Sequence, residues 1–202
     1  MLFDVTREEL AARFGADRLA TLPATAFPPS AVDGEGARLL QTVGVPTGTL
    51  RLRAPEEESG RLPLVQDVAD TAGFEDASPD MAAWPVIAWL LNAHLALDPA
   101  SGAVYAVDTD EETVRGLHTD VSSLIQVTAR FQGLLAEFTF GDDEEADFAR
   151  LEGEVERVGR ETSGVDPLPF QDDDTPWSVI GEEIAAGQRF TADSPGGRAL
   201  YG

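Results

Sequence analysis

The sequence predicts an α+β protein. Helical patterns occupy the first fifty residues, strand patterns with a hairpin occupy the centre, and helical patterns return after residue 120. Helices and strands that are segregated along a chain in this way are typical of the α+β class. The chain has 202 residues, of which 43% are hydrophobic. This length favours a single domain, and the composition supplies enough apolar side chains for a core.

Two short helices are expected near the amino terminus. Thr6 and Glu9 fit a capping box at the start of the first helix, and Gly15 can adopt the left-handed conformation that ends it. Residues 39–43 carry the apolar spacing of the second helix, and residues 44–46, Gly-Val-Pro, supply its stop.

The centre of the chain predicts strands. The candidates are residues 49–53, 62–65 and 86–91, together with a hairpin made by residues 94–97 and 103–107. Residues 49–53 alternate apolar and polar side chains, as a half-buried strand does. In the hairpin turn, Asp98, Pro99 and Gly102 supply a turn start, a fixed φ and a positive φ.

Two further helices are expected after the strands. Either Ser122 or Ser123 can cap the first of them, and apolar residues from Leu124 to Phe138 then recur every three or four positions. This spacing places them on one face, as in a helix that packs on a core. Residues 148–158 show a more polar version of the same pattern.

The last helix is expected to begin after Thr175 and to end at Gly187, and its buried side is expected to consist of Trp177, Ile180 and Ile184. Thr175 is a good capping residue, Pro176 suits the first helical position, and glycine is a common stop. The residues beyond it are polar and rich in glycine. We therefore expect one domain over residues 1–187 and a flexible polar tail over residues 188–202.

The charge of the chain is strongly negative. There are 37 Asp and Glu residues against 14 basic residues, all of them arginine, and the formal net charge is -23. A coding bias toward GC-rich codons would explain the absence of lysine and the mean charge without any function. It explains less well why sixteen acidic residues and only three arginines lie between Glu137 and Glu183.

This charge favours some partners over others. A basic protein is attracted at long range, whereas nucleic acid and anionic membranes are repelled. The absence of cysteine excludes a disulfide framework and fits a reducing compartment, and the amino terminus lacks the pattern of a signal peptide. The sequence also lacks a glycine-rich phosphate loop. We expect a cytoplasmic protein without a cofactor, either a monomer or a weak dimer.

Two kinds of catalytic or metal site can be weighed against simpler roles. A hydrolase could use four residues that lie close in sequence, His118, Asp120, Ser122 and Ser123. The serines lack the Gly-x-Ser-x-Gly context, so a capping role is favoured. The acidic runs 142–145 and 172–174 could bind calcium or magnesium, but they lack the spacing of an EF-hand loop. Solvated helix starts are favoured for both runs.

The order of several segments resembles the SUKH superfamily of immunity proteins, most closely its actinobacterial fourth group. The similar segments are Val43–Pro46 after an early helix, the hairpin Leu95–Tyr105, the helix start Val121–Leu124 and the closing helix Trp177–Ile184. The asparagine that often precedes the two serines in this group is Val121 here. Its role at the helix start therefore falls to Asp120 or Ser122.

The resemblance implies an α+β fold with a mixed, largely antiparallel sheet packed against helices. It also implies a protein that is not an enzyme and that binds and neutralises a cognate polymorphic toxin, often a nuclease or a nucleic-acid deaminase. An adaptor or regulatory module of the same fold is the alternative. The acidic surface then becomes the candidate contact with a basic toxin domain, with Trp177 as a possible apolar anchor. The candidate residues are Asp142, Asp143, Glu144, Glu145, Asp172, Asp173, Asp174 and Trp177.

Overall fold

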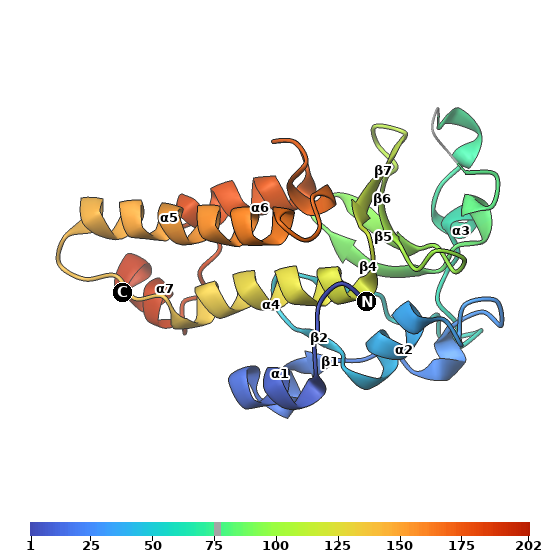
Figure 1. Ribbon diagram of the computed structural model, residues 1–202, viewed down its shortest axis with the longest axis horizontal. Coiled ribbons are helices and arrows are strands. Elements are labelled where there is room, and N and C mark those ends of the chain that lie inside the picture. Colours follow the sequence, from blue (N-terminus) through green and yellow to red (C-terminus); the bar gives the residue numbers. More distant parts are fainter. Residues whose placement is uncertain (75–77) are drawn as a thin grey trace. The chain divides into compact units, whose positions relative to one another are not determined.

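The computed structural model describes residues 1–74 and 78–202. The chain forms two compact units, Met1–Gln126 and Val127–Gly202, and helix α4 (Val121–Glu137) contains the boundary between them. Over the described residues the strands form a two-stranded and a five-stranded sheet, both antiparallel (Figure 1). The predicted α+β class is confirmed. The single domain over residues 1–187 stays a prediction.

The amino-terminal helices form where the sequence predicts them. Helix α1 spans Arg7–Phe14 and α2 spans Glu35–Thr42. Thr6 Oγ1 accepts a hydrogen bond from the Glu9 backbone N–H at 3.3 Å, so half of the capping box is present. The Glu9 carboxylate accepts a hydrogen bond from the Thr6 hydroxyl at 2.7 Å. In a complete capping box it would instead accept one from the Thr6 backbone N–H. Gly44 has a φ of 81°, which is the positive value expected of the stop after α2.

Short elements that the sequence did not predict connect these helices. Strands β1 (Leu19–Ala20) and β2 (Val45–Pro46) pair antiparallel and form the two-stranded sheet. Single 3₁₀ turns lie at Ala16–Arg18 and Ala24–Ala26. Each has only two or three residues, which is too short for a periodic pattern to be visible in the sequence.

The five-stranded sheet has the simple order β3-β4-β5-β6-β7. Its strands are β3 (Arg51–Leu52), β4 (Val86–Leu90), β5 (Ala93–Leu97), β6 (Val104–Asp108) and β7 (Thr113–His118). The predicted hairpin is confirmed, since β5 and β6 pair from Ala93 with Asp108 to Leu97 with Val104. Strand β7 was not predicted, because a half-buried strand with an arginine and a glycine in it shows no clear alternation.

The predicted strand at residues 62–65 is wrong. Leu64 makes only an isolated bridge with Pro85, and Val65 begins the short helix α3 (Val65–Val68). The Asp67 carboxylate accepts a hydrogen bond from the Leu64 N–H at 2.8 Å and so helps to turn the chain into this helix. A short apolar run fits either a buried strand or a buried helical turn, and tertiary contacts decided between them here.

Both faces of the sheet are covered within the first unit. One face packs against α3 and the 3₁₀ turns at Thr71–Gly73 and Met81–Ala83. The buried residues of this cluster are Val65, Phe74, Met81, Trp84, Val86, Ala96 and Val107. Helix α2 lies close to the other face of the sheet at Gly36. A Cβ on Gly36 would lie 3.2 Å from Leu97 and 2.8 Å from Val121. Only glycine permits that approach.

Helix α4 begins in the first unit, and its cap differs from the prediction. Asp120 Oδ1 accepts a hydrogen bond from the Ser123 N–H at 3.0 Å, so Asp120 and not a serine caps the helix. The resemblance to the fourth group had left this role to Asp120 or Ser122. Ser122 instead donates its hydroxyl to Asp120 Oδ1 at 2.6 Å.

The second unit consists of helices. After α4 come α5 (Glu144–Ser163), a 3₁₀ turn η5 (Leu168–Phe170), α6 (Pro176–Ala185) and α7 (Pro195–Tyr201) (Figure 1). The predicted start of α6 is confirmed, since Thr175 Oγ1 accepts a hydrogen bond from the Ser178 N–H and Pro176 is the first helical residue. Gly187 has a φ of 75° after its end.

The carboxyl-terminal segment contains one more helix than was predicted. Ser194 caps α7, and the buried ring of Phe190 lies 6.2 Å from that of Phe138. The Tyr201 hydroxyl donates a hydrogen bond to the Gly187 carbonyl at 2.9 Å. These contacts give the segment a defined place in the second unit, and the flexibility expected for residues 188–202 stays a prediction.

Candidate functional site

Helix α5 carries seven of the sixteen acidic residues that lie between Glu137 and Glu183, and one of its faces is buried. Leu151 and Val158 lie on that face. Helix α6 lies close to α5 at Gly181, which is buried. A Cβ on Gly181 would lie 3.0 Å from Val155. The burial of this face fixes which of the remaining α5 side chains reach solvent.

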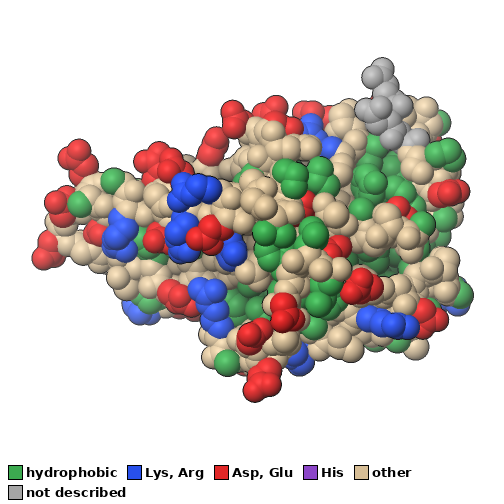
Figure 2. All heavy atoms as spheres, viewed as in Figure 1, with side chains coloured by type: hydrophobic (Ala, Val, Ile, Leu, Met, Phe, Trp, Pro, Cys, Tyr) green, Lys and Arg blue, Asp and Glu red, His purple; other side chains and the backbone are tan. Residues whose placement is uncertain are grey.

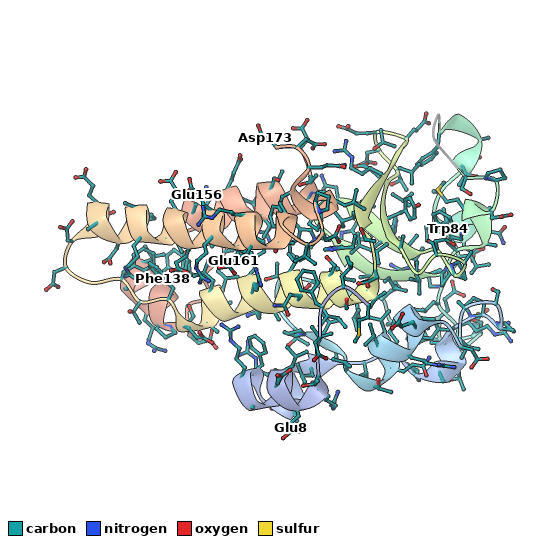
Figure 3. The ribbon with its side chains drawn as sticks, in the orientation of Figure 1. Glu8, Trp84, Phe138, Glu156, Glu161 and Asp173 are labelled. Atoms are coloured by element: carbon teal, nitrogen blue, oxygen red, sulfur yellow. The ribbon has the colours of Figure 1, made fainter. Side chains whose placement is uncertain are left out.

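A second face of α5 carries acidic and basic side chains that neutralise each other. Arg157 forms ion pairs with Glu154 and, at 3.3 Å, with Glu161, and Glu161 also lies 3.1 Å from Arg130 of α4. In Figure 3, Glu161 lies between α5 and α4. These pairs leave little net charge on this face of the helix.

A similar ion pair lies near the start of α5. Asp147 forms an ion pair with Arg150 at 2.6 Å and accepts a hydrogen bond from the Gly141 N–H. The Arg150 guanidinium, together with that N–H, holds the pKa of the Asp147 carboxyl below its usual range. Arg150 also lies over the ring of Phe138, with 4.1 Å between the guanidinium carbon and the ring centre.

A third face of α5 is acidic and not neutralised. Glu145, Glu152 and Glu156 are spaced by seven and four residues, so they form one line along the helix. All three side chains are exposed, and none forms an ion pair with a residue in the described ranges. We call these three residues the α5 acidic line. The spacing of these three residues is visible in the sequence. The ion pairs that neutralise the second face of α5 cannot be predicted from the sequence.

The two predicted acidic runs lie near opposite ends of α5. Asp143 caps the helix by accepting a hydrogen bond from the Ala146 N–H at 3.1 Å, and the rest of the 142–145 run is exposed at the same end. The 172–174 run is exposed after η5, which packs near the other end, where a Cβ on Gly159 would lie 3.8 Å from Phe170. A 20-residue helix is about 30 Å long. The runs therefore form separate groups, and the α5 acidic line begins at Glu145 in the first run and continues along the helix toward the second.

The figures show how this charge is distributed on the second unit. In Figure 3, Glu156 and Asp173 both point outward on the same side of α5 and α6. Figure 2 shows Asp and Glu side chains along this margin, whereas several Arg side chains lie lower on the same helices. Acidic side chains therefore predominate along this margin, which we call the acidic margin.

Trp177 lies in the interior of the second unit, whereas the predicted interface requires an exposed side chain. Its side chain is 0% exposed, and its ring stacks on that of Phe131 with 5.7 Å between the centres and an angle of 22°. This agrees with the helical spacing, which placed Trp177 on the buried side of α6. A fully buried ring presents no surface to a partner, so the role of apolar anchor does not fit this structure.

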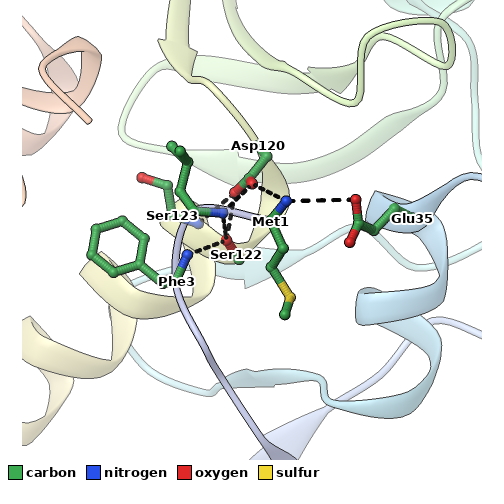
Figure 4. A network of polar contacts seen from close by, with 7 residues as sticks. Met1, Phe3, Glu35, Asp120, Ser122 and Ser123 are labelled. Atoms are coloured by element: carbon green, nitrogen blue, oxygen red, sulfur yellow. Dashed lines mark hydrogen bonds and ion pairs between the residues drawn. The ribbon is translucent and has the colours of Figure 1, made fainter. Parts of the chain in front are cut away.

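The residues of the possible hydrolase site make structural contacts. His118 Nδ1 lies 2.9 Å from Ser123 Oγ, and both side chains are completely buried. Ser122 Oγ accepts hydrogen bonds from the backbone N–H groups of Leu2 and Phe3, both at 3.0 Å (Figure 4). The group therefore fastens the amino-terminal segment to the start of α4.

The Asp120 carboxylate is the centre of this network. It accepts hydrogen bonds from Ser122, Ser123 and Leu2, and the amino group of Met1 lies 3.4 Å away. Burial by itself raises the pKa of Asp120, but the hydrogen bonds outweigh it and hold the pKa below its usual range. Asp120 is thus an ionised helix cap and not a proton donor at neutral pH.

Comparison with known families gives one match. The family model described as SUKH-4 immunity protein matches residues 5–183. The chain belongs to the SUKH-4 immunity protein family. Comparisons with curated proteins and with solved structures gave no match. The SUKH-4 family implies an immunity function and a toxin as partner.

The SUKH-4 match covers three of the four segments on which the resemblance was based, and it covers the fourth, Trp177–Ile184, up to residue 183. Val43–Pro46 contains the positive φ of Gly44, Leu95–Tyr105 forms the hairpin of β5 and β6, and Val121–Leu124 begins α4. Helix α7 lies beyond the matched residues. No helix in residues 1–74 and 78–202 of this SUKH-4 protein has the length and apolar character needed to cross a bilayer.

Proposed function

We propose that this SUKH-4 protein neutralises its cognate toxin in the cytosol by covering a basic surface of the toxin with the acidic margin of the second unit. The contact consists of the α5 acidic line with the two acidic runs at its ends, residues 142–145 and 172–174. A nuclease or nucleic-acid deaminase fits as the toxin, because enzymes that bind polyanions present basic surfaces.

The observation that carries the proposal is the unequal charge of the faces of α5. On one face the arginines pair with Glu154, Glu161 and Asp147. On the other face Glu145, Glu152 and Glu156 are exposed and make no ion pair within the described part of the chain. Carboxylates that form no ion pair within the chain keep their full charge for a basic partner.

The test compares two triple charge reversals. E145K/E152K/E156K alters the α5 acidic line, and E56K/E57K/E58K alters an exposed acidic run of the first unit by the same net charge. The toxin domain encoded beside this gene is the binding partner, and association rates are measured by stopped flow at low and at physiological salt. We expect the first variant to associate at least about tenfold more slowly and the second less than about threefold more slowly.

Co-expression with the same toxin domain gives the second readout. The wild-type protein and the control variant should restore growth, and the α5 variant should restore it poorly. Equal slowing by both variants would mean that net charge alone steers the encounter. Unchanged association and full protection by the α5 variant would refute the proposed contact surface. Survival of toxicity in the presence of wild-type protein would refute the neutralising function itself.

A further inference from the structure

The first unit has an exposed tryptophan on its sheet. Trp89 lies on β4, and it is 39% exposed although the other four residues of that strand are buried. Trp84 and Trp177 are 5% and 0% exposed. Exposing the apolar surface of an indole ring to water is unfavourable, so an exposed tryptophan on an otherwise buried strand suggests a binding role.

Two arginines lie beside this tryptophan. Arg51 of β3 is directly opposite Trp89, and the Arg53 N–H donates to the Ile87 carbonyl at 2.9 Å. Residues 51 and 53 alternate with Leu52, so their side chains lie on the same face of the sheet as the indole. β3 is the last strand in the sheet order, so this face lies at the edge of the sheet.

The positive charge here is not neutralised by the chain itself. Neither Arg51 nor Arg53 forms an ion pair with any side chain that the structure describes, although the net charge is -23. Arg51 is exposed and Arg53 is half-buried. Exposed tryptophan and arginine side by side are the residue types that contribute most to binding in protein interfaces.

The indole is held in place from behind. Its N–H donates to the Leu91 carbonyl, and its ring meets the ring of His94 edge to face with 4.2 Å between the centres. Leu91 has a φ of 52°, which a leucine rarely adopts. Since the indole N–H is already satisfied, the exposed part of Trp89 offers a partner an apolar surface in a fixed position.

The imidazole behind Trp89 favours its neutral form. Burial and the nearby charge of Arg53 both lower the pKa of His94, and its Nδ1 has no hydrogen-bond partner among the described residues. The positive charge of this region therefore belongs to the two arginines. Both arginines line a depression of about 590 Å³, together with Trp89, Glu56 and Glu57.

We propose that Arg51, Arg53 and Trp89, the Trp89 surface, bind an extended segment of another protein that carries a carboxylate and an apolar side chain two residues apart. Side chains two residues apart in an extended chain lie on one side, roughly 7 Å from each other. That spacing lets the carboxylate meet a guanidinium while the apolar group packs on the indole. The Trp89 surface belongs to the first unit and has the opposite charge to the acidic margin, so this inference does not depend on the proposed toxin contact.

The test uses the full chain and short peptides. The probe is acetyl-Asp-Ser-Phe-Ser-Asp-amide, with one analogue in which Asn replaces both Asp residues and another in which Ser replaces Phe. Acrylamide quenching of tryptophan fluorescence reports mainly Trp89, because the other two indoles are buried. At physiological salt, where charges beyond about 8 Å are screened, we expect the probe to protect Trp89 saturably.

The variants R51A and R51A/R53A should weaken binding, the double variant at least about tenfold, and R38A serves as the control. Arg38 is also exposed, but it lies on α2 away from the aromatic pair. Both peptide analogues should protect Trp89 at least about tenfold less well. The proposal is overturned if the probe gives no protection, if the Asn analogue binds equally, or if R51A matches R38A. Self-association of the wild-type chain that R51A/R53A abolishes would assign the surface to a second copy instead.

Discussion

Replacing Trp177 by alanine tests whether this side chain supports the fold or contacts a partner. The ring is completely buried and stacks on Phe131, which also lies 6.1 Å from the ring of Phe170. Truncating a buried tryptophan to alanine costs about 3–5 kcal/mol, because apolar contacts are lost and a cavity is left. Against a total stability of about 5–15 kcal/mol, we expect the thermal unfolding midpoint to fall by roughly 10 °C.

Far-UV circular dichroism is the appropriate measurement, since the substitution removes a fluorophore. W89A is the matched control, because it removes the same side chain from a position that is 39% exposed. We expect it to cost less than half as much, about 1–2 kcal/mol. An equal loss in the two variants would refute the reasoning from burial. If W177A left stability unchanged and weakened toxin binding, Trp177 would be an interface residue after all.

Three further substitutions test local features of the fold by urea unfolding. D120A should cost about 1–2 kcal/mol at pH 7, because the cap of α4 is lost. Because the pKa of Asp120 is lowered in the folded state, its carboxylate stabilises the fold fully at pH values above the usual carboxyl pKa. The difference in unfolding free energy between wild type and D120A should therefore shrink as the pH falls below about 4. A difference that grows in acid would contradict this expectation. G187A should cost about 1–2 kcal/mol, since the φ of 75° is strained for alanine and the new Cβ would lie 3.1 Å from Phe148. G153A, in open space on α5, should instead gain about 0.5–1 kcal/mol, and a loss there would show that α5 does not tolerate a side chain at this position.

Much of the local structure was predictable because its causes are local. The start of α6 at Thr175 and Pro176 and the stop at Gly187 depend on hydrogen bonds and dihedral angles within a few residues. The hairpin of β5 and β6 depends on its turn, and the apolar spacing of α4 depends only on helix geometry. The family resemblance also came from short segments in order, and the match over residues 5–183 confirmed it.

The sequence-based predictions failed where contacts with residues distant in the sequence determine the structure. Residues 62–65 had an apolar pattern that suits two structures, and their packing against Trp84 and the sheet selected the helix. Strand β7 exists because β6 pairs with it from Val104 to Asp108, although its own sequence has no clear alternation. Trp177 was assigned to both a buried side and an interface, and only the packing on Phe131 separated the two.

The sequence by itself determined the composition, the family and the positions of the caps, turns and longer helices, because each is a property of neighbouring residues. It also fixed the total negative charge. Only the tertiary structure decided which carboxylates are neutralised by arginines and which remain on the α5 acidic line, and which tryptophan is exposed beside Arg51. Ion pairing and burial depend on distances between residues from different elements, and those distances arise only when the elements pack.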